Sequence, residues 1–400
     1  MNKLSDRINR LNYSQTFVMS NKAREMKAKG IDVISLTLGE PDFDVPANVK
    51  KAAITAIHEN YSHYSPIPGF MELREAVSRK LKRDNGLDYQ PTQICISNGG
   101  KQSIINILLA LLNDGDEVIL PVPYWVSYAE MTKLAGGVPI FIKTSYETEF
   151  KITAEQLEKA ITPKTKILLY SSPCNPSGSY YTKEELVAIA KVIEKNPQIT
   201  VISDEIYEFL NYEEKHISIV NAYPNIYEQV AIVNGMSKGY AMTGWRIGYS
   251  ACPEWLAKGC DKIQGQLTSG ANTIAQRAAI EALNTDPKEY QYMVDSFKKR
   301  RDITYNLLKD IKGFKASLPK SAFYFFVDIS YYLGKHLNGV LIKDSDDLAM
   351  YLLENAYVAS VGGTSFGAEE CIRFSYATAE KDLIEAMKRI KECLDKAIIS

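Results

Sequence analysis

The middle of the chain alternates short apolar runs with amphipathic segments. Continuous apolar runs, without polar residues at every second position, are typical of strands that are buried on both faces. The segments between them have helical spacing, for example at residues 102–112, 125–134 and 183–195. Strands are expected at residues 94–97, 117–120, 138–142, 166–171, 200–203, 230–234 and 247–251. This alternation predicts an α/β fold with a mostly parallel sheet covered by helices on both faces.

The two ends of the chain follow a different pattern. Residues 1–30 indicate a helical lead-in ending at Gly30, before a strand at 33–37 and helices at 48–58 and 71–83. Beyond Asp286 the pattern predicts a long charged helix at 289–312, strands at 322–328, 358–361 and 372–376, and a final helix at 380–398. We therefore expect a large domain of residues 46–285, and a smaller α+β domain formed by residues 1–45 together with 286–400.

Composition restricts the function. The 47 Lys and Arg residues balance 48 Asp and Glu residues, and no basic stripe indicates nucleic-acid binding. The apolar runs are too short to span a bilayer, and the polar N-terminus lacks a signal sequence, so neither a membrane partner nor export is expected. The six cysteines and four histidines are scattered, which argues against a metal site and favours the reducing cytoplasm.

The most informative segment is a polar turn that follows the predicted strand at 230–234. It presents Lys238 directly after Ser237, and Arg246 follows between two glycines. A lysine amine can form a Schiff base with a carbonyl compound, while serine and arginine are natural partners of a phosphate. On this segment alone, a solvated loop lysine is the alternative.

Other polar residues also follow predicted strands, where an open α/β sheet places its ligands. Gly100 and Lys101 begin an apolar helix, whose free N–H groups favour an anion, although a plain strand-to-helix loop would look similar. The turn lacks the G-x-G-x-x-G spacing of dinucleotide-binding enzymes, which argues against a nicotinamide dehydrogenase. Trp125 can stack on a planar ring or simply pack, and Asn175 lies between two prolines in a turn-dense loop.

Two charged residues are expected at or inside buried strands. Asp204 directly follows an apolar strand, and its carboxylate needs a partner such as a protonated ring nitrogen, a lysine or an arginine. Arg373 lies within the predicted strand at 372–376. Its planar guanidinium can hold a carboxylate through two parallel hydrogen bonds, with a structural ion pair as the alternative.

In this order, the motifs resemble those of the fold-type-I, pyridoxal-phosphate-dependent aminotransferases of class I, within them the bacterial aspartate aminotransferase branch. The matching pieces are LGEPDF (38–43), YSPIPG (64–69), GGKQ (99–102), PYWVSY (123–128), SSPCNPSG (171–178), SDEIYE (203–208), SKGYAMTGWRIGY (237–249) and RFSYA (373–377). The resemblance covers nearly the whole chain. It implies a seven-stranded sheet in the large domain, pyridoxal 5'-phosphate as cofactor, and a homodimer with shared active sites.

The resemblance also implies a role for each site residue. Lys238 would form the Schiff base and move the proton during transamination, while Asp204 would keep the pyridine nitrogen protonated. Tyr207 and Asn175 would bind the cofactor's 3'-oxygen, and Trp125 would stack on its ring. The phosphate would be held by Gly100, Lys101, Ser237 and Arg246, and by Tyr64 from the partner subunit. Arg373 would bind the substrate α-carboxylate, helped by the backbone of Gly39. Cys174 and Ser177 replace residues common in the family, without an expected loss of activity.

In this branch, Lys101 and Thr16, with Ser14 nearby, match the residues that serve the distal carboxylate of the substrate. The resemblance therefore implies transfer of the amino group of L-aspartate to 2-oxoglutarate in ping-pong half-reactions, giving oxaloacetate and L-glutamate. Aromatic amino acids or prephenate are the alternative substrates, because relatives with the same GGK motif accept them. A C–S β-lyase on the same fold is a further alternative.

Overall fold

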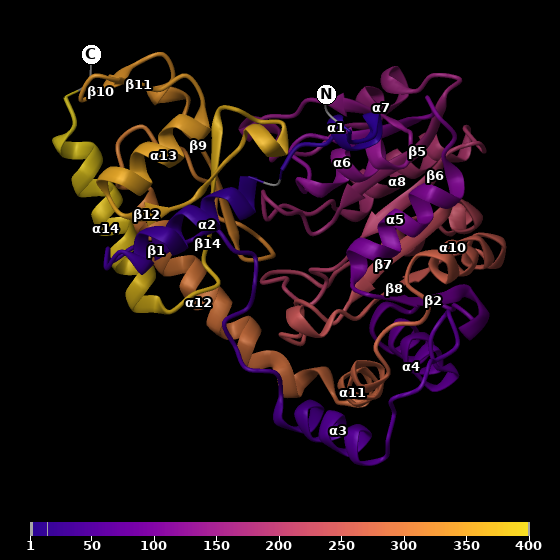
Figure 1. The fold of residues 1–400 in the computed structure, drawn as a ribbon. Helices are drawn as coiled ribbons and strands as arrows, with labels where there is room; N and C mark the ends of the chain where they lie inside the picture. Colours follow the sequence, from indigo (N-terminus) through magenta and orange to yellow (C-terminus); the bar gives the residue numbers. More distant parts are fainter. Residues whose placement is uncertain (1–2, 14, 399–400) are drawn as a thin grey trace.

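The computed structural model describes residues 3–13 and 15–398, and its largest element is a seven-stranded sheet. Its strands lie in the order β2-β8-β7-β6-β5-β3-β4, and β2, β8, β7, β6 and β5 are labelled in Figure 1. β8 runs antiparallel to both of its neighbours, and the remaining pairs are parallel. The bounds are β2 (Ile94–Ser97), β3 (Glu117–Pro121), β4 (Val138–Ile142), β5 (Thr165–Ser171), β6 (Thr200–Asp204), β7 (Val230–Gly235) and β8 (Gly248–Ala251). The predicted α/β fold is confirmed.

The central strands are apolar throughout because helices cover both faces of the sheet. Leu168 of β5 faces one hydrophobic core, while its neighbours Ile167 and Leu169 face the other. Val201 and Ile202 of β6 divide between the two cores in the same way. The helices of this region are α5 (Gly100–Leu111), α6 (Ser127–Leu134), α7 (Ala154–Ala160), α8 (Lys183–Glu194), α9 (Ile219–Ala222) and α10 (Glu254–Leu267).

A group of helices connects this sheet to the C-terminal part of the chain. α3 (Ala47–His58) and α4 (Met71–Lys80) pack on α11 (Thr273–Asn284). α12 (Gln291–Leu308) then leads to a second sheet (Figure 1). This antiparallel sheet has the order β13-β14-β9, and β9 (Tyr324–Asp328) and β14 (Cys371–Ser375) are its longer strands. The remaining elements are β10 (His336–Leu337), β11 (Val340–Leu341), α13 (Ser345–Asn355), β13 (Val361–Gly362) and α14 (Glu380–Lys396).

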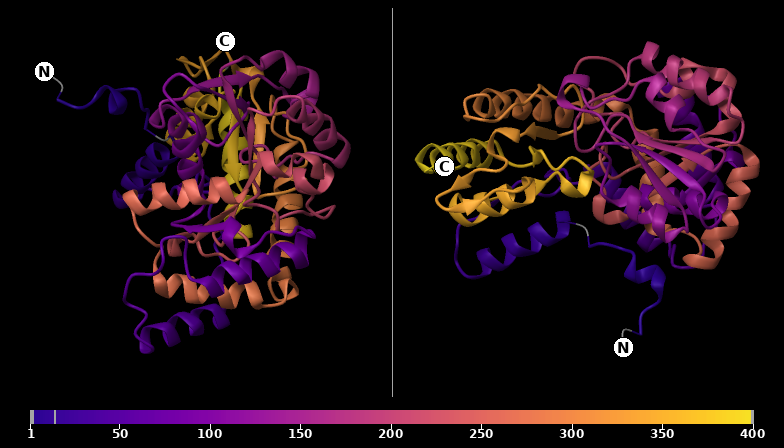
Figure 2. Two further views of the ribbon diagram at one scale, coloured as in Figure 1. Left: turned by 90° about the vertical axis from the view of Figure 1, so that its right-hand side faces the viewer. Right: turned by 90° about the horizontal axis from the view of Figure 1, so that it is seen from above.

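The N-terminal segment packs against the C-terminal part. β1 (Ile34–Ser35) pairs in parallel with β12 (Val358–Ala359). Figure 2 shows α2 (Gln15–Ala28) beside the C-terminal elements, while α1 (Asp6–Asn9) lies on an arm that extends from the body. Met19 and Val33 share a hydrophobic core with Phe374 of β14. The domain limits at residues 45/46 and 285/286 stay predictions.

Several expected elements differ from those in the structure. The lead-in at 1–30 contains two helices, and the helix expected at 125–134 begins only at Ser127, because residues 122–126 form the turn that follows β3. The strand expected at 358–361 is divided, because its first half pairs with β1 and its second half with β14. None of the helices that the structure describes is long and apolar enough to cross a membrane.

Candidate active site

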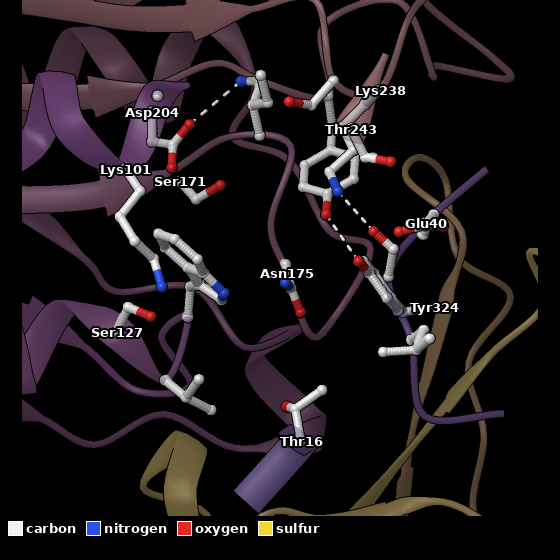
Figure 3. Close-up of a pocket in the computed structure, with 18 of the residues that line it drawn as sticks. Thr16, Glu40, Lys101, Ser127, Ser171, Asn175, Asp204, Lys238, Thr243 and Tyr324 are labelled. Atoms are coloured by element: carbon white, nitrogen blue, oxygen red, sulfur yellow. Dashed lines mark hydrogen bonds between the residues drawn. The ribbon is translucent and has the colours of Figure 1, made fainter. Parts of the chain in front are cut away.

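A pocket of about 630 Å³ lies where the carboxyl ends of the parallel strands face the C-terminal sheet and α2. Figure 3 shows Thr16, Lys101, Asn175, Asp204 and Lys238 around this space. Twelve of the thirteen site residues expected from the sequence line it: Thr16, Gly39, Gly100, Lys101, Trp125, Asn175, Asp204, Tyr207, Ser237, Lys238, Arg246 and Arg373. The thirteenth, Tyr64, is 94% exposed and does not line the pocket. Ser14 lies outside the described residues.

Lys238 lies on the turn after β7, and its amine donates a hydrogen bond to the carbonyl oxygen of Gly39. Within the described part of the chain, the amine has no ion pair. Burial lowers the pKa of Lys238 to about 8; the charge of Glu40 opposes this shift, while those of Arg246 and Arg373 act in the same direction. A lowered pKa increases the fraction of neutral amine near neutral pH, which is the nucleophilic form.

Asp204 is the last residue of β6 and is almost completely buried. Its Oδ2 accepts a hydrogen bond from the Tyr128 hydroxyl at 2.6 Å, and its Oδ1 accepts one from the N–H of Ile206 at 3.2 Å. Burial raises the pKa of Asp204 to about 6, and both hydrogen bonds oppose that shift. A cationic ligand group at this carboxylate would favour its ionised form.

The N-terminus of α5 and the side chain of Arg246 line the same pocket. The first N–H groups of α5, which begins at Gly100, have no partner within their own helix. Gly99 has φ 84°, and a Cβ there would lie 2.5 Å from Nη2 of Arg246. Arg246 itself donates to the carbonyl oxygen of Thr243 at 2.7 Å. This arrangement of N–H groups and a guanidinium suits a phosphate.

Arg373 is a buried cation of the pocket, and it is 2% exposed. Its Nη1 donates to Oδ1 of Asn175 at 2.9 Å, and its Nη2 donates to the carbonyl oxygen of Thr37. Its Nε has no hydrogen-bond partner, and no carboxylate among the described residues pairs with it. Burial lowers the pKa of Arg373. A buried guanidinium that meets only neutral acceptors is suited to a ligand carboxylate.

Lys101 is the fourth cation that lines the pocket, and its side chain is exposed. Its ammonium lies 4.9 Å from the ring centre of Trp125. Partial desolvation lowers the pKa of Lys101, and the charge of Arg246 adds to this effect. Thr16 reaches the same pocket from α2.

Two tyrosines of the pocket were not assigned a role from the sequence. Tyr128 lies three residues after Trp125, and nothing in that spacing indicates its bond to Asp204. Tyr324 begins a strand that is buried along its whole length, so its sequence pattern indicates only core packing. Its hydroxyl nevertheless bonds to that of Tyr207 at 2.7 Å (Figure 3).

Together, the pocket residues fit pyridoxal phosphate. N–H donors and a guanidinium line the same pocket as a buried carboxylate, and a lysine amine with a lowered pKa is available for a Schiff base. Gly99 leaves the anion site open, because a side chain at this position would collide with Arg246. The unpartnered Nε of Arg373 leaves a donor for a substrate carboxylate.

Comparison with known proteins identifies the class: residues 31–390 match the family model for class I and II aminotransferases, and the chain belongs to this family. It is therefore a pyridoxal-phosphate-dependent enzyme that uses amino acid and oxo acid substrates. The chain is 47% identical over 390 residues to a probable aspartate/prephenate aminotransferase of Rhizobium leguminosarum bv. phaseoli, with 97% of this chain and 98% of the relative covered.

Solved structures agree with the family and the fold. An aspartate aminotransferase from Rhizobium meliloti superposes with a TM-score of 0.96 at 38% identity, with 100% of each chain covered. The aspartate aminotransferase from Thermus thermophilus with maleate gives a TM-score of 0.91 at 40% identity, with 98% of this chain and 100% of that chain covered. The prediction of fold type I is confirmed.

Proposed function

We propose that the enzyme transfers the amino group of L-aspartate to 2-oxoglutarate, giving oxaloacetate and L-glutamate. The observation that carries this proposal is the pair of cations at the substrate end of the pocket. Arg373 has no carboxylate partner among the described residues, and Lys101 lies over Trp125 at the pocket wall. A substrate with two carboxylates neutralises both, whereas an apolar side chain would leave Lys101 desolvated and unpaired.

The names of relatives support a dicarboxylic substrate. The Rhizobium relative is described as a probable aspartate/prephenate aminotransferase, and the Thermus enzyme was solved with maleate, which is a dicarboxylate. Prephenate is a second candidate substrate, because it also has a second carboxylate for Lys101.

We propose the residue roles that the resemblance to the family implies, and the placement of these residues around one pocket supports them. Lys238 binds the cofactor and carries the proton that leaves the substrate α-carbon. Pyridoxal phosphate, when bound, supplies a ring that withdraws electrons from that carbon. Asp204, held by Tyr128, keeps a proton on the ring nitrogen, while Tyr207 and Asn175 bind the ring oxygen and Trp125 covers the ring face.

The phosphate and the substrate carboxylates are held by different groups of the chain, with the backbone N–H of Lys101 at the phosphate and its ammonium at the distal carboxylate. Gly100, Lys101, Ser237 and Arg246 bind the phosphate through N–H groups, a hydroxyl and a guanidinium. Arg373 binds the α-carboxylate beside Gly39, and Thr16 lies near the distal carboxylate with Lys101.

We also propose a homodimer in the cytoplasm. The exposed Tyr64 completes the phosphate site of the partner subunit, which requires two chains to share their active sites. The six cysteines are free, as suits a reducing compartment. Tyr64→Phe should weaken cofactor binding without dissociating the dimer, as measured by cofactor titration and sedimentation; unchanged cofactor binding would contradict the role of Tyr64. Cell fractionation tests the compartment.

An absorbance scan tests the proposed activity. The purified holoenzyme should have a visible band that bleaches when aspartate is added without an oxo acid, because the cofactor takes up the amino group. Bleaching by phenylalanine but not by aspartate would contradict the substrate assignment. A C–S β-lyase would release its product without leaving the amino form of the cofactor.

A variant of Lys101 tests the selectivity. Lys101→Ala should lower kcat/KM for aspartate by about tenfold, the effect of one partly exposed charge pair, with a much smaller effect for phenylalanine. Lys133→Ala is the matched control, because Lys133 pairs with Glu130 outside this pocket. Equal losses for aspartate and phenylalanine in the Lys101 variant would contradict the role of Lys101.

A further inference from the structure

Tyr324 connects the two sheets at the pocket. It is fully buried at the start of β9 in the antiparallel sheet, whereas Tyr207 follows β6 of the seven-stranded sheet. The two hydroxyl oxygens are 2.7 Å apart, and either one can be the donor. The rings meet edge to face, with their centres 5.8 Å apart.

The ring of Tyr324 also supports Arg373. In the β9–β14 ladder, Arg373 lies opposite Phe326, and Tyr324 lies opposite Ser375. Residues 324 and 326 share a face of the sheet, so Tyr324 is the diagonal neighbour of Arg373. The guanidinium carbon lies 4.6 Å from the centre of the Tyr324 ring, a geometry in which the ring face attracts the cation.

The third contact of Tyr324 is Gly39. An added Cβ on Gly39 would lie 1.9 Å from the Tyr324 hydroxyl oxygen, so this close approach requires a glycine. The carbonyl oxygen of Gly39 accepts the hydrogen bond from Lys238. Tyr324 therefore contacts three residues of the pocket. These are Gly39, which accepts a hydrogen bond from the Lys238 amine, Tyr207, the proposed partner of the ring oxygen, and Arg373, the proposed partner of the carboxylate.

We propose that Tyr324 is a positioning residue that acts through Tyr207 and Arg373, an inference that rests on the proposed roles of these two residues. A phenol has one proton to donate. When Tyr324 donates to the Tyr207 oxygen, the Tyr207 proton is directed away from Tyr324 and toward the cofactor's ring oxygen. The Tyr324 ring meanwhile keeps the guanidinium of Arg373 in place for the substrate carboxylate.

The two parts of this role can be separated by two variants. Tyr324→Phe keeps the ring beneath Arg373 but removes the hydroxyl, so kcat should fall about fivefold with little change in KM, the effect of one neutral hydrogen bond. Tyr324→Leu also removes the aromatic face, so the KM for aspartate and for phenylalanine should each rise by about tenfold.

Tyr376→Phe is the matched control. Tyr376 is also a fully buried tyrosine, and its hydroxyl bonds to Tyr212 at 3.3 Å and to the carbonyl oxygen of Ala322 at 3.1 Å. Neither Tyr376 nor Tyr212 lines the pocket. This variant therefore loses a buried hydroxyl without changing either part of the proposed role.

The decisive readout is a pH titration of the visible absorbance of each holoenzyme without substrate. A Tyr207 hydroxyl that donates to the ring oxygen favours the deprotonated form of the lysine-bound cofactor. Tyr324→Phe should therefore move the absorbance midpoint to higher pH, while Tyr376→Phe leaves it in place. A midpoint that stays in place or moves to lower pH in Tyr324→Phe would overturn the inference alone. A wild-type protein with no visible band would instead overturn the proposed function.

Discussion

Two lysines of this protein, the buried Lys80 and the partly buried Lys238, show how differently enclosed charges are used. Lys80, at the end of α4, is 1% exposed and forms an ion pair with Glu208, and it also donates to Asn85 at 2.8 Å. Lys238 donates to the carbonyl oxygen of Gly39, which is a neutral acceptor. Lys80 is thus paired with a carboxylate, whereas Lys238 forms no ion pair among the described residues, although the charges of Glu40 and Asp204 act on it.

The charged groups near the two lysines differ in the same way: those near Lys80 form ion pairs, and those in the pocket have neutral hydrogen-bond partners. Near Lys80, the Glu205 carboxylate bonds to His216 at 2.9 Å. Burial acts to raise the pKa of Glu205, but the charge and hydrogen bond of His216 hold it below its usual value. In the pocket, the charged groups Asp204 and Arg373 meet a tyrosine and an asparagine instead of opposite charges.

The difference separates groups that hold the fold from groups that bind a ligand. A buried ion that is paired inside the chain needs nothing further, whereas a buried ion with only neutral partners is destabilising until a ligand completes it. The charged groups of the pocket therefore lack partners that pyridoxal phosphate and a substrate carboxylate can supply. The Lys80 region, in contrast, is structural. Four changes test this division.

Replacement of the pocket lysine should have the largest effect on activity. Lys238→Ala should lower kcat by about a thousandfold or more, because it removes both the Schiff-base amine and the proton carrier. Steady-state assays measure the loss, and the unfolding temperature should stay close to that of the wild type. Near-normal turnover would refute the role of Lys238.

Replacement of the structural lysine should affect stability instead. Lys80→Met leaves Glu208 buried without its cation, so the free energy of unfolding should fall by about 3–5 kcal/mol. Urea unfolding of the cofactor-free protein measures this change. The double variant Lys80→Met/Glu208→Gln is the control, and it should recover most of the loss. A Lys80 variant with normal stability and poor turnover would reverse the assignment of the two lysines.

The buried arginine of the pocket should tolerate even a conservative change poorly. Arg373→Lys keeps the charge but loses the planar fork, so kcat/KM should fall by about 10- to 100-fold for every amino acid. Parallel assays with aspartate and phenylalanine check this expectation. If only aspartate were affected, Arg373 would bind the distal carboxylate instead of the α-carboxylate.

The pH dependence of cofactor uptake should be the smallest of the four effects. Burial gives Lys238 a folded-state pKa of about 8, so its amine is protonated below that pH and neutral above it. Because only the neutral amine attacks an aldehyde, uptake of pyridoxal phosphate by the cofactor-free protein should slow as the pH falls through about 8. Stopped-flow absorbance measures the rate. A midpoint above pH 10 would mean that the amine behaves as a solvated lysine.

The sheet could be predicted from the sequence because burial on both faces leaves a local pattern. The strand expected at 230–234 is β7 (Val230–Gly235), and the one expected at 138–142 is β4 (Val138–Ile142). The twelve pocket residues were found because they follow such strands or match motifs of the family. Their roles stay predictions.

The contacts between pocket residues that lie far apart in the sequence leave no such local pattern. Tyr324 and Tyr207 are 117 residues apart, and Arg373 and Thr37 are 336 residues apart. The first pair meets where the seven-stranded sheet faces β9, and the second because residues 36 and 37 run beside β14, where the Leu36 carbonyl oxygen accepts from the N–H of Ser375. No local spacing indicates either contact. The pairing of Lys80 with Glu208 is equally long-range, so the sequence alone does not tell the structural lysine from the pocket lysine.

The most direct test of this division is to locate the lysine that holds the cofactor. The holoenzyme is reduced with borohydride, which fixes a Schiff base as a stable amine, and the label is then located by digestion and mass spectrometry. The assignment of Lys238 as the cofactor lysine predicts a pyridoxyl label on Lys238 and unlabelled Lys80 and Lys101. A label on either of these two lysines, or a protein that binds pyridoxal phosphate without any labelled lysine, would contradict it.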